Sequence, residues 1–251
     1  MIEHERLMYQ IIGAISESDV PLVFKGALIT KLILAENGYT AFQRPTVDID
    51  ANWIGTPPKM EELVRTIDRS LTSFNGEFYA EARREYGDKK SAGIAIVEVA
   101  SENRVVSMDI SIKPVMGSKV YYYGEIGIKG VLANEILADK ITVLSKQIMF
   151  RRIKDLIDIY AIAHCVMVRT DKIFDVLKNN PNREVGTFNE FIFRQQDVEH
   201  AYDRLRGIEN KPPFDQVYEY VMNFIQPFAN RDMTPRVWNS NKASWDACPE
   251  R

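Results

Sequence analysis

Apolar and polar residues follow two different spacings along the chain, and each spacing predicts its own kind of element. Residue-by-residue alternation, typical of a strand with one buried face, is clearest at 46–54 and 104–112. Strand character also marks 76–86 and 92–100, and the aromatic segment 119–128 predicts an edge strand or a linking hairpin. The three- and four-residue apolar spacing of amphipathic helices recurs at 3–18, 27–36, 59–73, 134–148 and 153–168.

The order of these elements predicts two halves. Strands and helices mix in the first half, where the short apolar run 21–27 closes on a glycine and predicts a strand end before the second helix. From Leu132 onward only helical spacing recurs, so we expect a boundary near residue 130. The residues from about Thr234 carry Trp, Asn and Pro, and we expect them to form a loosely held tail.

Composition narrows the class of protein. The 251 residues are 45% apolar, which suits a globular protein with a sizeable core, and the net charge of −3 excludes a surface that is basic throughout. The segment MIEHERLMYQIIGAI lacks the apolar core and cleavage site of a signal peptide, and no apolar stretch is long enough to span a membrane. Cys165 and Cys248 lie far apart and outside any zinc-ligand pattern. We therefore expect a cytoplasmic protein without a membrane partner.

Three aspartates on two predicted strands are the leading candidates for chemistry. Asp48 and Asp50 alternate with Val47 and Ile49, so both carboxylates leave the same face of their strand. Asp109 lies on the polar face of the strand 104–112. Neighbouring carboxylates repel each other unless a cation intervenes, and magnesium bound by a few carboxylates and substrate phosphates is the common solution. If the two strands are neighbours, the three carboxylates suit two-metal phosphoryl or nucleotidyl transfer.

A glycine turn lies upstream of these aspartates. In FKGALITKLIL (24–34), Gly26 separates a strand end from a helix and permits close approach of a ligand to the backbone. The first N–H groups of the following helix would face an anion such as a phosphate, and Lys25 adds a positive charge beside them. By itself, this pattern favours a plain strand-to-helix turn. The phosphate-binding interpretation gains support from Asp48 and Asp50, which follow within one helix and one strand.

These motifs together resemble a known family. VFKGALITKLIL, RPTVDID and NEILADKITVLSKQIMFRRIKDLIDIYAI, which together cover about residues 22–165, are similar to the AbiEii/AbiGii family of toxin-type nucleotidyltransferases. That family lies within the DNA polymerase β-like nucleotidyltransferase superfamily. The resemblance implies an α+β fold, in which a nucleotidyltransferase-type mixed β-sheet with flanking helices (1–130) carries the catalytic residues. A C-terminal helical domain (131–251) is expected to complete the active-site cleft.

The resemblance also implies an activity and its residues. The expected enzyme moves a nucleotide from an NTP to an acceptor hydroxyl, with Mg²⁺ as the metal and Mn²⁺ as its alternative. The resemblance points to RNA, in particular a tRNA end, as the acceptor, and leaves a small molecule or a protein open as alternatives. A cognate antitoxin is the protein partner that it implies. The residues implied as metal ligands are Asp48, Asp50 and Asp109. Those implied in nucleotide binding are Lys25, Gly26, Ala27, Thr46 and Lys140. At Ala27 the family has glycine or serine, so phosphate contacts there must come from the main chain.

The helical half adds a lysine and two aspartates. Lys140 lies at the margin of an apolar helical stripe, where its stem can pack while its ammonium points toward a cleft. Asp155 and Asp158 are three residues apart and share one helix face, so spacing alone does not separate them. The resemblance implies that Lys140 contacts nucleotide phosphates and that one of the aspartates orients it or acts as a general base. A plain helix-surface salt bridge is the alternative interpretation.

Two other functions compete with nucleotidyl transfer. A metal-dependent nuclease would need an acidic residue two positions before a strand lysine, but Ser111 stands there before Lys113. A non-catalytic nucleotide-binding or interaction module is favoured only by Ala27. The basic run Arg151, Arg152 and Lys154 offers RNA-phosphate contacts or simply a solvated helix start.

Overall fold

A computed structural model of the chain describes residues 2–39, 45–86, 91–146, 152–180, 183–208 and 210–248. Arg44 and Arg151 lie outside these residues, as do the last two residues of the helix expected over 134–148. The chain divides into two compact units: unit 1 is Met1–Leu32 with Pro45–Leu132, and unit 2 is Ile33–Arg44 with Ala133–Arg251.

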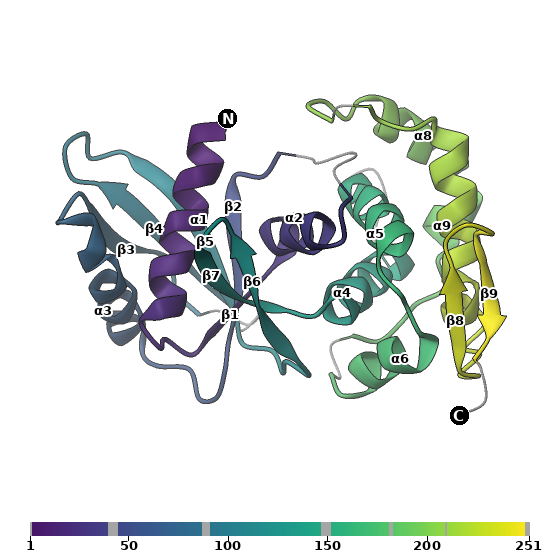
Figure 1. Ribbon diagram of the computed structural model, residues 1–251, viewed down its shortest axis with the longest axis horizontal. Coiled ribbons are helices and arrows are strands. Elements are labelled where there is room, and N and C mark those ends of the chain that lie inside the picture. The colour runs from purple at the N-terminus through teal and green to yellow at the C-terminus, as the bar shows by residue number, and fades with distance from the viewer. Residues whose placement is uncertain are drawn as a thin grey trace. The chain divides into compact units, whose positions relative to one another are not determined.

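Unit 1 is built on one seven-stranded sheet (Figure 1). Its helical elements are α1 (Ile2–Glu17), the start of α2 (Gly26–Glu36), α3 (Met60–Ser70) and the 3₁₀ turn η1 (Leu71–Phe74). Its strands are β1 (Leu22–Lys25), β2 (Asp48–Trp53), β3 (Phe78–Arg84), β4 (Ser91–Glu98), β5 (Arg104–Ser111), β6 (Ser118–Tyr123) and β7 (Ile126–Val131). The aromatic segment expected as an edge strand or hairpin supplies both, because β6 pairs with β7 at one edge of the sheet.

The sheet is mixed, as the α+β fold class predicts. Its strand order is β3-β4-β5-β2-β1-β7-β6. β2 pairs in parallel with β5, and β1 pairs in parallel with β7. The remaining neighbours are antiparallel, including β1 with β2. β2 therefore lies at the centre of the sheet, between β5 and β1.

The apolar face of this sheet forms the core of unit 1. Ile49 and Ala51 on β2 and Met108 and Ile110 on β5 are all buried, as their alternation with polar residues predicts. Helices α1 and α3 contact each other and also the sheet, α1 at β7 and α3 at β3. Since the apolar residues are anchored beneath these helices, the polar residues between them are held on the opposite face.

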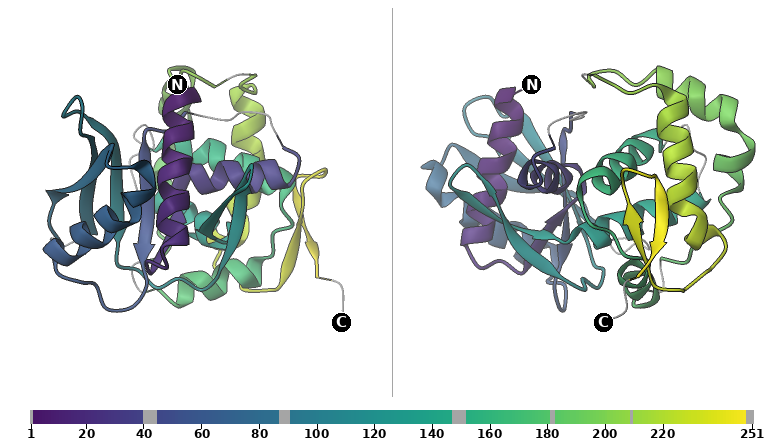
Figure 2. Two further views of the ribbon diagram at one scale, coloured as in Figure 1. Left: turned by 60° about the vertical axis from the view of Figure 1, so that its left-hand side comes forward. Right: turned by 45° about the vertical axis from the view of Figure 1, so that its right-hand side comes forward.

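Unit 2 is helical with one small sheet. Its helices are α4 (Ala133–Lys146), α5 (Ile153–Cys165), α6 (Thr170–Lys178), α7 (Asn189–Phe193), α8 (Gln195–Asp203) and α9 (Phe214–Ala229). They precede the two-stranded sheet of β8 (Arg236–Asn239) and β9 (Ser244–Ala247), drawn in yellow in Figure 2. None of the described helices is long and apolar enough to cross a membrane.

The expectation of a loosely held tail after Thr234 is wrong. Strands β8 and β9 form an antiparallel hairpin in which Trp238 is only 4% exposed. The Trp245 indole donates a hydrogen bond to the carbonyl of Phe224 on α9, and the Trp238 indole donates to the Tyr220 hydroxyl. Both tryptophans also pack edge-on or tilted against the Phe224 ring. Aromatic burial against α9 therefore holds a segment that has too few residues to show a periodic pattern.

Candidate active site

The polar face of β2 carries two carboxylates in the arrangement that the sequence predicts. Asp48 is exposed and Asp50 is half-buried, while Ile49 between them is 1% exposed. Ile49 therefore anchors β2 in the core, and both aspartates leave the opposite face. Asn52 continues the same series one step further and is fully buried.

Asp109 on the neighbouring strand faces the same side of the sheet. In the parallel pairing of β2 with β5, Asp50 lies opposite Asp109 and Asp48 lies opposite Ser107. Paired residues of neighbouring strands point to the same face, so three carboxylates share one surface. Asp50 and Asp109 are immediate cross-strand neighbours.

The glycine bend lies directly against this surface. Gly26 is the first residue of α2 and has a φ of +69°, a conformation that side-chain-bearing residues rarely adopt. A Cβ atom added there would lie 2.2 Å from Oδ2 of Asp50, so only glycine fits. Ala27 is buried, which leaves only its main chain for a ligand. The bend brings the start of a helix next to the central carboxylate.

Two other predicted nucleotide-binding residues have local partners. Lys25 lies opposite Asp50 in the antiparallel pairing of β1 with β2, and its ammonium donates a 2.8 Å hydrogen bond to Oδ1 of Asn52. The Thr46 hydroxyl donates a 3.3 Å hydrogen bond to the carbonyl of Asp48. Sequence reasoning missed Asn52, although its place in the i, i+2 series after Asp48 and Asp50 was a usable signal.

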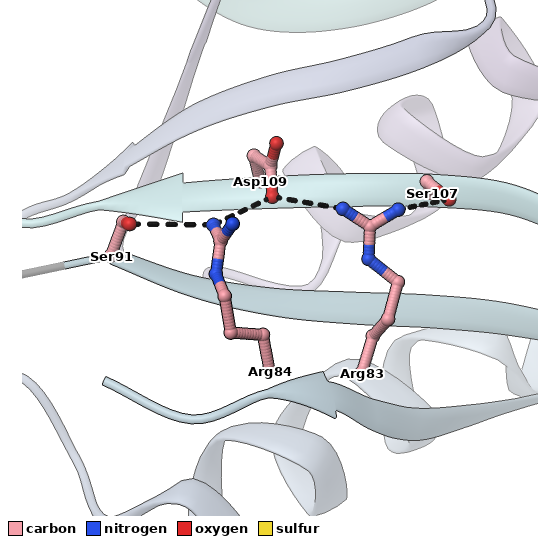
Figure 3. Close-up of polar contacts among 5 residues, drawn as sticks. All are labelled: Arg83, Arg84, Ser91, Ser107 and Asp109. Carbon is pink, nitrogen blue, oxygen red and sulfur yellow. Dashed lines mark hydrogen bonds and ion pairs between the residues drawn. The ribbon is translucent and has the colours of Figure 1, made fainter. Parts of the chain in front are cut away.

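Two arginines that the sequence did not single out reach Asp109 (Figure 3). Arg84 on β3 donates to Oδ1 of Asp109 at 3.0 Å, and Arg83 approaches the same oxygen at 3.5 Å. Arg83 also donates to the Ser107 hydroxyl at 3.0 Å, and Arg84 donates to the Ser91 hydroxyl at 3.3 Å. The third carboxylate therefore carries two guanidinium partners.

The donor set fits partial ligation of magnesium. Among the residues that the structure describes, no group of three or more His, Cys, Asp or Glu side chains is arranged to hold a metal ion. Magnesium rarely needs such a group, because it keeps waters and substrate phosphates and takes only one or two carboxylates from the protein. Asp48 and Asp50 on one strand, with Asp109 opposite, provide hard oxygen donors of this kind.

Lys140, Asp155 and Asp158 form a cluster within unit 2. The Lys140 ammonium donates to Oδ1 of Asp155 at 2.9 Å and to Oδ2 of Asp158 at 2.5 Å. Nε of Arg152 approaches Oδ2 of Asp155 at 2.9 Å. All three members are buried, so the cluster is an internal ion-pair network rather than the exposed salt bridge considered from the sequence. The i, i+3 spacing left a choice between the aspartates, and Lys140 binds both.

A mixed sheet with an acidic strand beside a glycine bend is the arrangement expected for the nucleotidyltransferase class. The family model described as "Nucleotidyl transferase AbiEii toxin, Type IV TA system" matches residues 6–219, and the chain belongs to this family. The resemblance noted from the motifs is thereby confirmed.

Comparisons with solved structures and with curated protein sequences add no further evidence for the function. Among solved structures, the chain is similar to MenT4, a nucleotidyltransferase toxin from Mycobacterium tuberculosis, at 15% identity and a TM-score of 0.47. That match covers 85% of this chain and 75% of the MenT4 chain. A search of curated protein sequences gives no match.

Proposed function

We propose that this protein transfers a nucleotide from an NTP to an acceptor hydroxyl and acts as the toxin of a toxin–antitoxin pair. The observation that carries the proposal is the in-register pairing of Asp50 with Asp109 beside the bend at Gly26. Membership of the AbiEii nucleotidyl transferase toxin family supports the same activity.

Each residue of the surface has a proposed task. Asp48, Asp50 and Asp109 would hold Mg²⁺, with Mn²⁺ as an alternative. When bound, the metal would supply charge neutralisation for the triphosphate and activation of the attacking hydroxyl. The first N–H groups of α2, at Gly26 and Ala27, point at a phosphate, which the helix dipole favours. Lys25 adds positive charge at the same end of β1, opposite Asp50.

Thr46 contributes to nucleotide binding by holding the backbone at the start of β2. Its hydroxyl is bonded to the carbonyl of Asp48, which fixes the chain where it enters β2. Because this hydrogen bond links the two residues, Thr46 and Asp48 would be positioned together for contact with the nucleotide.

The proposed acceptor is an RNA 3′ end, with a tRNA as the first candidate, and the proposed protein partner is a cognate antitoxin. Both follow from the family and not from the site. The roles of Lys140 as a phosphate contact, and of Asp155 or Asp158 as a general base, are carried over from the same resemblance. Because the ammonium of Lys140 is bonded to both aspartates, these roles need a test that separates stability from activity.

The test is an acceptor and NTP screen. Purified protein is incubated with Mg²⁺, each labelled NTP and total RNA, and the products are resolved on a denaturing gel. We expect label to become covalently attached to RNA, and Asp48→Ala to lower the rate by at least about a thousandfold. Glu61→Ala removes an exposed carboxylate from α3 in the same unit and should leave the rate unchanged.

Three results would count against the proposal. Label that attaches to no acceptor, in RNA, protein or small-molecule fractions, would favour a non-catalytic module. RNA that becomes shorter in a Mg²⁺-dependent manner would favour a nuclease. Equal rates for wild type and Asp48→Ala would remove the carboxylate surface from the mechanism.

A further inference from the structure

A β-bulge in β3 presents two consecutive arginines on the carboxylate face of the sheet. The pairing of β3 with β4 runs from Ala82 opposite Ile94 directly to Arg84 opposite Gly93, so one extra residue, Arg83, is inserted. In a regular strand, consecutive side chains point to opposite faces. The bulge changes this alternation, and both guanidinium groups reach β5 on the same side as Asp109.

Gly93 leaves room for both arginine side chains to cross β4. A Cβ atom at this position would lie 3.3 Å from Cβ of Arg84 and 3.4 Å from Nε of Arg83. Ser91 and Ser107 then accept hydrogen bonds from the two guanidinium groups (Figure 3). The bulge, the glycine and the two hydroxyls together fix the direction of both arginines.

Asp109 engages only part of the donor capacity of the two arginines. Both guanidinium groups approach the same oxygen of this carboxylate, and each guanidinium carries five N–H donors. The side chains of Arg83 and Arg84 are 34% and 51% exposed, and ion pairs with that exposure contribute little to stability. An exposed pair of forked, positively charged donors suits a phosphate group.

We propose that Arg83 and Arg84 bind a backbone phosphate of the single-stranded RNA acceptor. This inference rests on the proposed function. In nucleotidyl transfer, the attacking hydroxyl and the leaving pyrophosphate lie on opposite sides of the reacting phosphorus. Gly26 follows β1, on one side of β2, whereas the arginines come from β3, beyond β5 and β4 on the other side. A triphosphate at Gly26 therefore leaves the arginine side to the acceptor.

RNA binding is the first test, because it needs neither catalysis nor metal. A fluorescently labelled single-stranded RNA is titrated with the full chain in the presence of EDTA, and anisotropy is followed at several salt concentrations. The double variant Arg83→Gln/Arg84→Gln should weaken binding about tenfold or more, as expected for the loss of charge-assisted hydrogen bonds. The slope of log K against log salt should become shallower by about 0.7 for each phosphate that the variant no longer neutralises.

Two control variants distinguish phosphate binding by Arg83 and Arg84 from a general effect of positive charge and from positioning of Asp109. Arg65→Gln/Arg69→Gln removes the same charge from exposed positions of α3 and should change the affinity less than twofold. Asp109→Asn removes the carboxylate that competes for the guanidinium groups and should tighten RNA binding about two- to fivefold. Arginines that only position Asp109 would leave RNA binding unchanged in every one of these variants.

Steady-state kinetics then distinguish the two phosphate-bearing substrates. We expect Arg83→Gln/Arg84→Gln to raise the KM for RNA and to leave the KM for NTP within twofold. A raised NTP KM with unchanged RNA binding would overturn the inference and assign the pair to the triphosphate. If no transfer to any acceptor is detected while RNA binding still depends on both arginines, the proposed function fails and this binding site stands.

Discussion

Replacing Lys140 by methionine tests what the buried cluster of Lys140, Asp155 and Asp158 does. The substitution keeps the apolar stem and removes the ammonium that binds both carboxylates. Lys140 and Asp155 are 7% exposed and Asp158 is 4% exposed, so water has little access to replace the lost partner. Removing one member of a buried ion pair costs about 3–5 kcal/mol, because the remaining charge stays buried without its partner.

The lower end of that range is the expected result. Arg152 lies 2.9 Å from Asp155, so we expect that carboxylate to keep a cationic neighbour in the variant. The assay is a urea unfolding curve that is monitored by circular dichroism. A loss of about 3 kcal/mol with an m-value near 3 kcal/mol/M lowers the midpoint by about 1 M.

Two matched variants make the result interpretable. Lys154→Met removes an exposed lysine from α5 and should change stability by less than about 0.5 kcal/mol. The triple variant Lys140→Met/Asp155→Asn/Asp158→Asn removes the charge of all three cluster members and should recover much of the loss. A Lys140→Met protein with wild-type stability would refute the structural reasoning. If that protein were also inactive, the lysine would be held for the nucleotide, as the family resemblance implies.

Two further predictions concern single residues. Gly26→Ala should lower stability by about 1–3 kcal/mol and should also lower the rate of nucleotidyl transfer. The new Cβ would collide with the Asp50 carboxylate, and alanine rarely adopts a φ of +69°. A thermal melt identical to that of the wild type would contradict this geometry. Burial between Tyr160 and Tyr220 lowers the pKa of His164 below 6.5, partly opposed by a hydrogen bond with the Tyr160 carbonyl. The unfolded chain then binds a proton before the folded one does, so stability should fall as pH drops below about 6.5, toward the folded-state pKa. Urea midpoints between pH 7 and 5 should show this slope in wild type and in His200→Gln but a smaller one in His164→Gln.

The local pattern predicted those parts of the fold that depend on a single segment. The alternation of Asp48, Ile49 and Asp50 defined a strand and its two faces, because Ile49 enters the core. The expected burial of Val47 is wrong, since this residue precedes β2 and is 64% exposed. The same reasoning placed Asp109 on a polar strand face. It did not show that β2 and β5 are neighbours, since strand pairing depends on contacts distant in sequence. The parallel register that sets Asp50 opposite Asp109 had to come from the structure.

The missed features share a physical reason. The arginines of β3 gave no signal, because a bulge alters the alternation from which strand faces are predicted. The hairpin of β8 and β9 gave none, because each strand has only four residues and is held by tryptophan contacts with α9. Similarly, helical spacing put Asp155 and Asp158 on one face but did not show that one ammonium binds both.

The close contact between Gly26 and Asp50 also constrains how this site can drift during evolution. The space that a side chain at position 26 would need is filled by the carboxylate at position 50, so changes at the two positions are coupled. A lineage that lost the carboxylate would release the restriction on size at position 26, although the positive φ would still favour glycine or asparagine there. Among relatives, a larger residue at the bend should therefore accompany the loss of the aspartate and mark chains that have given up this chemistry.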